Sequence, residues 1–467
     1  MRFNREFIQS VIPTVQFLGK PISQDIELTI DVDDFGDKKA FIAFKDNDND
    51  FDNTADMFKA LENGVSCLII NNEQKNLLEA HDASFGKKVS VILFSAVKQA
   101  LVDLAVAWRA QLSCQIVGIT GSVGKTSTVK AFENILELSG LPFMSFEVVE
   151  NQHINACLTI LNIKPETKVA VVEMGVTKRG DMSKMAEVIR PTSAVITSIG
   201  HSNMEGLGSI VDIANEKKDI FKFFKESNIG IINGDQTILS TISYKHPTVK
   251  FGCKTTNQVQ ARKIQTGSAN THFVLKFYKD RFKISLNTNH IGGIMNALAA
   301  AAASYLVGIS TDIIMEGIQK PISIHGRFEH KKLNFDKGVL INDCYSATPE
   351  SMKAALLAFE KFESKGQKIA VLGDMQELGV NSPFWHRQLG RFLRKVSSLN
   401  QVILVGEMVQ WTKDTVPVGL NFEHFNDWKT AADYLKIKLD KEAVILVKGS
   451  QKLQLNNLIA ELSNSTN

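Results

Sequence analysis

The central part of the chain alternates between short apolar runs and stretches whose apolar residues recur at helical spacing. Apolar runs occupy residues 115–120, 168–175, 193–200 and 229–235, and an amphipathic stretch at 127–140 follows the first of them. Runs of this length are typical of parallel strands that are buried on both faces of a sheet. The pattern therefore predicts a βαβ core in this part of the chain.

The carboxyl-terminal third of the chain shows the same alternation. Apolar runs at 338–346, 367–375, 401–408 and 443–449 are separated by stretches with helical spacing. Strands that alternate with helices predict a parallel sheet covered by helices on both faces. We expect a doubly wound, Rossmann-like α/β domain here.

The first hundred residues predict a smaller α/β unit. Strand-like runs occupy 40–44, 65–70 and 89–94, and a helical pattern at 97–111 leads into the central part. A length of 467 residues agrees with three domains at about 150 residues each. The predicted domains are 1–105, 106–322 and 323–467.

Two further patterns lie within the central part. Residues 259–287 alternate between apolar and polar positions, which predicts an antiparallel meander. The alanine-rich stretch 294–309 predicts a buried helix, because it is too short for a membrane span and carries Asn296.

Composition and charge narrow the class of protein. Hydrophobic residues make up 44% of the chain and charged residues 22%, which is ordinary for a globular protein and excludes a disordered one. The formal net charge of +3 comes from 53 basic and 50 acidic residues spread evenly along the chain. A nucleic-acid partner is therefore not expected, since binding to a phosphate backbone needs a basic stripe.

The cysteines and the amino-terminal segment indicate the compartment. The five cysteines are widely spaced and form no CxxC motif, which is typical of free thiols in a reducing compartment and not of a zinc site. The first residues lack the apolar run of a signal peptide. We expect a cytoplasmic monomer that does not insert into a membrane.

The clearest local motif is the segment Gly118-Ile-Thr-Gly-Ser-Val-Gly-Lys-Thr126, between a predicted strand and a predicted helix. Backbone N–H groups in such a loop and at the following helix N-terminus bind phosphate oxygens. The strict loop pattern asks for glycine where the chain has Ile119, so a chance GKT after a turn is the alternative; the order strand, loop, helix favours a phosphate loop. The residues assigned to phosphate binding are Gly121, Ser122, Gly124, Lys125 and Thr126.

This variant of the loop, GxTGSxGKT, resembles the one carried by the Mur ligase family, and the resemblance extends over nearly the whole chain. The further motifs that resemble the family are Glu173-Met-Gly175, the stretch from Ile199 to Lys217, Asn296-Ala-Leu-Ala-Ala, His325-Gly-Arg327, the stretch from Asp343 to Pro349, the stretch from Val371 to Gly379 with His386 downstream, and Val447-Lys-Gly-Ser450.

The resemblance implies an activity and a fold. Mur ligases use ATP to join an amine to a carboxylate through an acyl phosphate. The GDMxELG sequence at 373–379 and the VKGS sequence at 447–450 resemble the branch that adds D-alanyl-D-alanine to a UDP-muramoyl-peptide carboxylate. The resemblance implies that the first domain binds the UDP-linked substrate, that the central domain is a parallel-sheet P-loop ATPase, and that the third domain binds the amine. ATP and Mg²⁺ are the implied cofactors.

The resemblance also implies roles for single residues. Lys125 and Arg327 would meet the phosphates, because both carry the positive charge that suits oxyanions. Thr126 and Glu173 would hold Mg²⁺ through oxygen ligands. Lys217 matches a lysine that is carbamylated in the family, and its carbamate would hold a second Mg²⁺.

The remaining assignments concern the ends of the two substrates. Asn296 would bind the adenine edge of ATP, and Asp343 would accept hydrogen bonds from its ribose hydroxyls. The residues assigned to the amine substrate are Ser346, Thr348, His386 and Lys448.

Each of these positions also has an ordinary structural interpretation. Glu173 and Lys448 could be charged residues at strand ends, and Asn296 could pack or cap locally within its helix. His386 could lie on the surface. Lys217 could be an exposed helix lysine, as most lysines are, with Lys218 as the alternative register.

The chain departs from the family where the substrates should bind. In the first domain, Val32 and Asp33 stand where the family carries a serine and an arginine that recognise the uridine nucleotide. In the central domain, Asn203 stands at a position that is usually histidine, and His201 lies two residues earlier. The motifs assigned to ATP match the family, whereas positions assigned to the substrates differ. Two kinds of enzyme agree with this pattern: a divergent member of this branch, or a paralogue that joins an amino acid or dipeptide to a carboxylate without UDP.

A function of another class is a non-catalytic protein that binds ATP for regulation. The joint presence of Glu173, Lys217, Arg327 and Asp343 favours the ligase, because a chain that had lost ligation would not keep them together.

Overall fold

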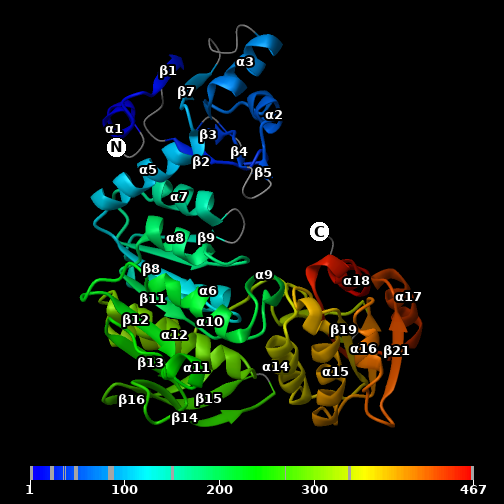
Figure 1. Ribbon diagram of the computed structural model, residues 1–467. Helices are drawn as coiled ribbons and strands as arrows, with labels where there is room; N and C mark the ends of the chain where they lie inside the picture. Colours follow the sequence, from blue (N-terminus) through cyan, green and yellow to red (C-terminus); the bar gives the residue numbers. More distant parts are fainter. Residues whose placement is uncertain are drawn as a thin grey trace.

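The computed structural model describes residues 4–21, 26–34, 36, 38–46, 51–82, 89–148, 152–268, 270–334 and 338–463. Within these residues the strands form three larger sheets, which follow one another along the chain, and one two-stranded ribbon. Figure 1 shows the first unit at the top, the central unit below it, and the C-terminal unit beside the central one.

The first sheet has the order β1-β7-β6-β3-β2, with β1 antiparallel to β7 and the other neighbours parallel. Helix α5 connects this sheet to the central one, and its apolar face belongs to a core that continues into the central unit. The elements are α1 (Arg5–Val11), β1 (Gln16–Gly19), β2 (Glu27–Thr29), β3 (Lys39–Ile42), β4 (Lys45–Asp46), β5 (Phe51–Asp52), α2 (Asp56–Glu62), β6 (Cys67–Ile70), α3 (Asn72–His81), β7 (Ser90–Leu93) and α5 (Val97–Gln111).

The central sheet has the order β16-β15-β14-β13-β12-β11-β8-β10-β9. Its strands are parallel from β9 to β14, and β14, β15 and β16 form an antiparallel meander. The strands are β8 (Gln115–Thr120), β9 (Phe143–Val148), β10 (Val169–Met174), β11 (Ser193–Ile196), β12 (Ile229–Asn233), β13 (Thr248–Gly252), β14 (Val259–Thr266), β15 (Thr271–Phe277) and β16 (Asp280–Leu286).

Helices cover the central sheet, and the sheet order determines where the site forms. Strands β11, β8 and β10 are parallel neighbours, so the residues that follow them meet at one edge. The helices are α6 (Lys125–Ser139), α7 (Gln152–Asn162), α8 (Asp181–Ile189), α9 (Met204–Leu207), α10 (Ile210–Lys218), α11 (Thr237–Ser240), α12 (Ile291–Leu306) and α13 (Thr311–Gly317).

The C-terminal sheet has the order β17-β18-β22-β19-β20-β21 and is parallel except for β17. Its central strands are fully buried between two apolar clusters, one on each face. The elements are β17 (Glu329–Lys332), β18 (Val339–Asn342), α14 (Pro349–Glu360), β19 (Lys368–Gly373), α15 (Ser382–Phe392), β20 (Gln401–Val405), α16 (Gln410–Lys413), β21 (Asn421–Phe425), α17 (Trp428–Lys438), β22 (Val444–Lys448) and α18 (Leu455–Leu462).

The α/β fold predicted from the apolar runs is confirmed, including the meander and the doubly wound C-terminal sheet. The limits of the three domains stay predictions. The limit at residue 105 lies inside α5, which packs against α7 and α8 of the central unit, and the limit at 322 lies between α13 and β17.

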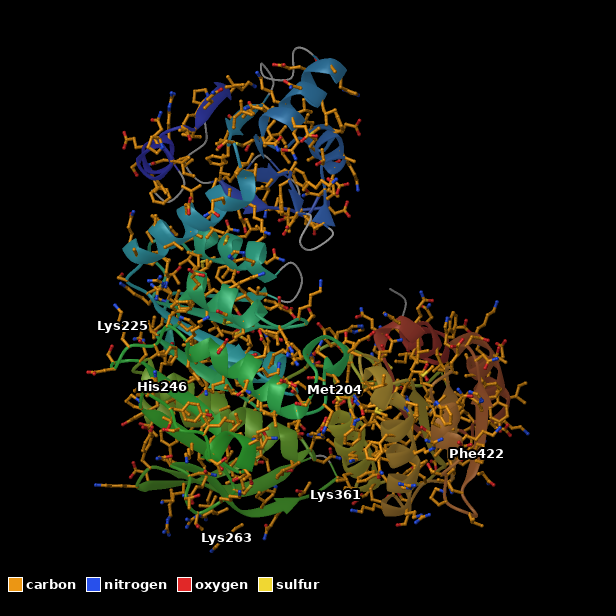
Figure 2. The ribbon with its side chains drawn as sticks, in the orientation of Figure 1. Met204, Lys225, His246, Lys263, Lys361 and Phe422 are labelled. Carbon is orange, nitrogen blue, oxygen red and sulfur yellow. The ribbon has the colours of Figure 1, made fainter. Side chains whose placement is uncertain are left out.

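The central and C-terminal units meet along the segment that contains α9. Met204 packs against the apolar cores of both units and lies at their junction in Figure 2. None of the described helices is both long enough and apolar enough to span a membrane.

Candidate active site

The phosphate loop follows β8 and leads directly into α6. A Cβ at Gly121 would lie 1.9 Å from Thr197 Oγ1, and a Cβ at Gly124 would lie 2.5 Å from Asn296 Oδ1. Both glycines also have positive φ values, of 154° and 92°. Only glycine fits this conformation and this close approach. The loop therefore makes the tight turn that leads into the N-terminus of α6, where backbone N–H groups can meet an anion.

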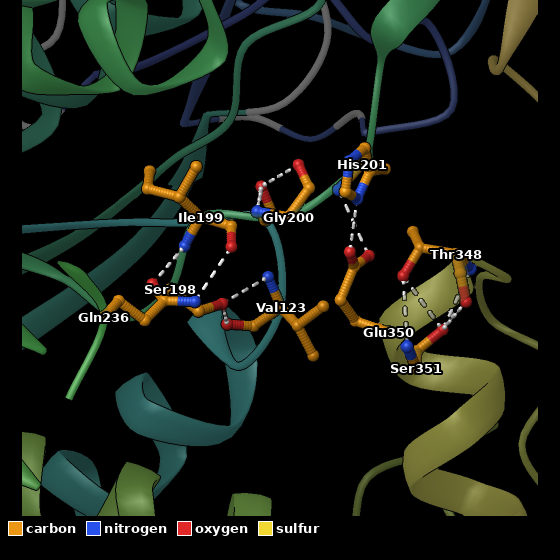
Figure 3. A network of polar contacts seen from close by, with 10 residues as sticks. Val123, Ser198, Ile199, Gly200, His201, Gln236, Thr348, Glu350 and Ser351 are labelled. Carbon is orange, nitrogen blue, oxygen red and sulfur yellow. Dashed lines mark hydrogen bonds and ion pairs between the residues drawn. The ribbon is translucent and has the colours of Figure 1, made fainter. Parts of the chain in front are cut away.

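The segment after β11 lies against the phosphate loop and is hydrogen-bonded to it (Figure 3). Ser122 N donates to Ser198 O at 2.8 Å, and Val123 N donates to Ser198 Oγ at 3.1 Å. Gly200 N donates to Ser122 Oγ at 3.0 Å. These bonds join the loop to residues 198–200 and fix its position.

Lys125, Thr126 and Glu173 lie together at the start of α6. Glu173 is the penultimate residue of β10. Its Oε1 accepts from Thr126 Oγ1 at 3.2 Å and lies 3.9 Å from Lys125 Nζ. The carboxylate is buried, and burial raises the pKa of Glu173 against the opposing effect of Lys125. Burial likewise lowers the pKa of Lys125. The site therefore holds opposite charges in a place with little water, where electrostatic interactions are strong.

Lys217 is one of the largest fully buried side chains of the protein. It lies in the last turn of α10 at 2% exposure, and no hydrogen bond or ion pair of its side chain is found within the described parts of the chain. Burial, and then the charge of Lys125, lower the pKa of Lys217 to about 7. Lys218 is only half-buried. With a pKa of about 7, a substantial fraction of this amine is neutral near neutral pH, and a neutral amine is a nucleophile.

Arg327 brings the C-terminal unit to the phosphate loop. Its Nη2 donates to Thr126 Oγ1 at 2.9 Å, and its guanidinium lies over the Tyr345 ring at 4.2 Å. Its Nε is buried and has no hydrogen-bond partner in the described structure. A buried guanidinium N–H without a partner beside a phosphate loop can donate a hydrogen bond to a phosphate oxygen.

Asn296 lies near the Thr126 end of this contact, and Asp343 lies near the Arg327 end. Asn296, on α12, touches Gly124 and accepts from Thr128 Oγ1 at 3.4 Å. Asp343 follows β18 and uses both carboxylate oxygens within its own unit: Phe328 N donates to Oδ1 at 3.1 Å, and Lys448 Nζ lies 2.8 Å from Oδ2.

Comparison with known proteins explains the arrangement. Residues 119–304 match the family model described as Mur ligase middle domain, and residues 326–451 match Mur ligase, glutamate ligase domain. The chain is 31% identical over 426 residues to the UDP-N-acetylmuramoyl-tripeptide–D-alanyl-D-alanine ligase of Bacillus subtilis, covering 89% of this chain and 88% of the relative. The chain belongs to the Mur ligase family. It is an ATP-dependent ligase that forms an amide, and the predicted resemblance is confirmed.

Other relatives and solved structures agree. The ligase of the same name from Escherichia coli is 29% identical over 377 residues, covering 79% of this chain and 82% of the relative. The structure of MurF from Acinetobacter baumannii superposes with a TM-score of 0.82 at 22% identity, covering 98% of both chains. MurF from Thermotoga maritima in complex with ADP gives 0.77 at 22% identity, covering 94% of this chain and 97% of the other. At this identity the structures show the fold.

The structure puts the four residues assigned to the amine into the C-terminal unit of this Mur ligase, in different settings. Thr348 caps α14 and accepts from Ser351 N at 3.2 Å, while Ser346 O accepts from Lys448 Nζ at 2.8 Å. His386 is fully buried: its Nε2 accepts from Met375 N at 3.1 Å. Its Nδ1 lies 2.8 Å from Ser382 O. The side chains of His386 and Lys448 therefore face the interior of the unit and hold its loops.

Sequence reasoning missed the polar contacts between the two units. His201 pairs with Glu350, and Asn203 Nδ2 donates to Glu377 Oε2 at 2.9 Å. The available signal was the departure from the family pattern at Asn203, with His201 two residues earlier. It did not identify the partners, which lie far along the chain.

Glu216 fixes the helix that carries Lys217. Its carboxylate is buried and accepts from Gly180 N and Met182 N, both at 2.8 Å, at the start of α8. Residues 180–182 follow the loop after Glu173, so Glu216 ties the helix of Lys217 to the strand end that carries Glu173.

Replacing Glu216 with alanine should destabilise the protein by about 1–3 kcal/mol, because two buried backbone donors lose a charged acceptor. Denaturant unfolding monitored by circular dichroism measures this change. Glu187→Ala, at the other end of α8, is the control, because Glu187 is not one of these acceptors. Equal stability of the Glu216→Ala variant and the parent would contradict the structural role of the carboxylate.

Proposed function

We propose that the enzyme joins D-alanyl-D-alanine, or a similar amine, to the carboxylate of a UDP-linked muramoyl peptide. The substrates are those that the names of its relatives in Bacillus subtilis and Escherichia coli give. The observation that carries the chemistry is the contact of Arg327 with Thr126, which brings a guanidinium from the third unit to the phosphate loop. The central and C-terminal units thus meet at the phosphate loop, where ATP, carboxylate and amine have to come together.

In the proposed reaction the carboxylate attacks the γ-phosphate of ATP, and the amine then attacks the acyl phosphate. The enzyme has to hold crowded negative charge while phosphate is transferred. Lys125, Arg327 and the backbone N–H groups at the N-terminus of α6 are the positive groups that do this. Asn296, beside Gly124, is proposed to hold the adenine edge, and Asp343 the ribose.

The residues present fit a magnesium ion. The hydroxyl of Thr126 and the carboxylate of Glu173 are adjacent oxygen donors at the phosphate loop, which is the ligand chemistry that Mg²⁺ prefers. We propose that these two residues hold Mg²⁺, which neutralises phosphate charge when bound. Lys125 and Arg327 act beside them by orienting the phosphates.

We propose that Lys217 carries a carbamate. The buried lysine has no polar partner in the described structure, and its charge is opposed by Lys125. A carbamate would replace this repulsion with attraction and would supply oxygen donors for a second Mg²⁺.

The amine is proposed to bind on the C-terminal unit at the loop that carries Ser346 and Thr348. Lys448 supports this role by binding Ser346 O, and His386 by holding the strand end at Met375. We further propose that residues 1–105 bind the nucleotide-linked substrate, 106–322 ATP, and 323–467 the amine. The enzyme is proposed to act as a cytoplasmic monomer on small molecules.

Phosphate release tests the function. The assay crosses UDP-muramoyl tripeptide and simple carboxylates with D-alanyl-D-alanine and single amino acids. Release that requires both the UDP-linked carboxylate and the dipeptide supports the proposal. Release with a carboxylate that lacks UDP would favour the paralogue, and release without any acceptor would indicate a protein that does not ligate.

The first unit contains the observation that favours the paralogue. Val32 packs against the core of this unit, and Asp33 is exposed and pairs with Lys59 at 2.8 Å. Neither side chain offers the hydroxyl or the guanidinium that the family uses for the uridine nucleotide. A carboxylate close to a diphosphate is unfavourable by about 1 kcal/mol or more at surface-like dielectric.

We therefore expect the full-length enzyme to bind UDP weakly or not at all in calorimetry. The Val32→Ser, Asp33→Arg double variant should bind UDP about tenfold more tightly than the parent, which corresponds to about 1.4 kcal/mol. An Asp103→Arg variant controls for net charge at a position on α5. Micromolar binding of UDP by the parent would show that other residues of the first unit have taken over, and would favour the UDP-linked substrate.

A further inference from the structure

A histidine and a glutamate meet across the junction of the central and C-terminal units (Figure 3). His201 follows β11 in the central unit, and Glu350 is in the first turn of α14 in the C-terminal unit. His201 Nδ1 lies 2.6 Å from Glu350 Oε1, and His201 N donates to Glu350 Oε2 at 3.1 Å. Both carboxylate oxygens thus hold one residue, so the position and orientation of the ring are fixed.

The contact determines which ring nitrogen is free to accept a proton. With an ionised glutamate, the imidazole is the donor at Nδ1, so Nε2 carries the lone pair of the neutral ring. Nε2 of His201 has no hydrogen-bond partner within the described residues, and the side chain keeps 20% of its surface exposed. One side of the ring packs against Trp385 at 4.1 Å between centroids. A carboxylate that orients an imidazole with a free Nε2 is the arrangement of a general base.

This imidazole lies next to the phosphate loop. Gly200, the preceding residue, exchanges two hydrogen bonds with Ser122: its N–H donates at 3.0 Å and its carbonyl accepts at 3.1 Å. A Cβ at Gly200 would lie 2.8 Å from Glu350 Cδ, so glycine is needed for the glutamate to approach. The backbone is therefore shaped to hold His201 both at the phosphate loop and at the C-terminal unit.

The ligation has a step that needs a base. The amine substrate is an ammonium ion near neutral pH, and it has no lone pair for attack on the acyl phosphate until one proton leaves. We propose that His201 Nε2 accepts this proton and that Glu350 is the positioning residue that orients the ring. The proposal rests on the ligase function proposed above.

The step balances as follows. The ammonium gives one proton to Nε2 of His201, and the neutral amine attacks the acyl carbon. The C–N bond forms and the C–O bond to phosphate breaks, with the electron pair leaving on the phosphate oxygen. The second proton of the nitrogen goes to the departing phosphate, and His201 later releases its proton to water.

The charged groups around His201 come from both units. Glu350 contacts the ring directly. Lys353 Nζ lies 5.5 Å from the centroid of the Trp385 ring, which packs against His201. Glu377 contacts the segment that follows His201. Its Oε2 accepts from Asn203 Nδ2 at 2.9 Å, and its backbone carbonyl accepts from Glu205 N at 3.0 Å. The alternative to a base is a clamp, in which His201 and Glu350 only hold the two units together.

A comparison of two nucleophiles separates a base from a clamp. Hydroxylamine is largely unprotonated at neutral pH, so it attacks an acyl phosphate without a base. The His201→Gln variant should form the amide with D-alanyl-D-alanine about 100-fold more slowly than the parent, but should form the hydroxamate at close to the parent's rate. The deficit with the dipeptide should shrink as the pH rises, because more of the amine is then neutral.

Further variants complete the test. Glu350→Gln should show the same split between nucleophiles with a smaller loss, and His272→Gln, at an exposed position on β15, should behave as the parent. Thermal unfolding confirms that each variant is folded. Equal losses with both nucleophiles, or no loss with either, would overturn the assignment of His201 as the base. If the parent forms neither amide nor hydroxamate, it is the proposed ligase function that fails.

Discussion

Replacement of Lys125 with alanine should lower turnover by about 100- to 1,000-fold while the protein stays folded, which is the range for the loss of one electrostatic group at a transition state. Lys125 is the first residue of α6, next to the buried carboxylate of Glu173. Charge accumulates on the phosphates during transfer, and Lys125 is the ammonium group of the phosphate loop. Its loss therefore affects the transition state more than the bound ground state.

The fold should tolerate this change. Burial lowers the pKa of Lys125, so its charge is held at a cost to the folded state, and removal of that charge does not take away a stabilising contact of the core. Steady-state phosphate release with saturating substrates measures turnover, and thermal unfolding measures stability. Lys130→Ala, which removes an exposed partner of Glu133 on the same helix, is the matched control. A Lys125→Ala variant with more than about a tenth of the parent's activity would contradict the phosphate-loop assignment.

The fold could be predicted from sequence mainly where strands are buried on both faces. Strands such as β10 and β22 consist of continuous apolar residues because both faces pack against helices. Most of the strands that the pattern did not predict lie at sheet edges, for example β9 and β21. Their residues are half exposed, so no apolar run marks them.

In the candidate site, the features formed by consecutive residues could be predicted from the sequence, and those formed by residues far apart in the chain could not. The phosphate loop is contained in nine consecutive residues, so its motif was readable along the chain. The choice between Lys217 and Lys218 needed burial, which depends on how α10 packs. The contact of His201 with Glu350 joins residues 149 positions apart, and only the docking of two units creates it. The buried position of His386 is likewise a property of the packed C-terminal unit.

The second large effect is expected at Lys217. Replacement with alanine should lower turnover by about 100-fold or more, because it removes the group that we propose to carry a carbamate at the phosphates. A small added carboxylate such as acetate should restore part of the activity, since the space left by the side chain admits an oxygen ligand. Lys218→Ala is the matched control: it changes the neighbouring, half-buried lysine and should keep the parent's activity.

If Lys217 carries a carbamate, the activity of the parent enzyme should depend on carbon dioxide, and the recovery of activity should increase with pH. Carbon dioxide reacts with the neutral amine, and a pKa of about 7 makes Lys217 neutral in a growing fraction as the pH rises through that value. An ordinary lysine would be almost fully protonated in the same range. After preparation in buffer free of carbon dioxide, activity should fall and should return on addition of bicarbonate. The return should be more complete at pH 8 than at pH 6, because the neutral fraction of the amine is about tenfold larger at pH 8. Full activity of the parent without bicarbonate, together with a Lys217→Ala variant that acetate does not rescue, would show that the buried amine acts without a carbamate.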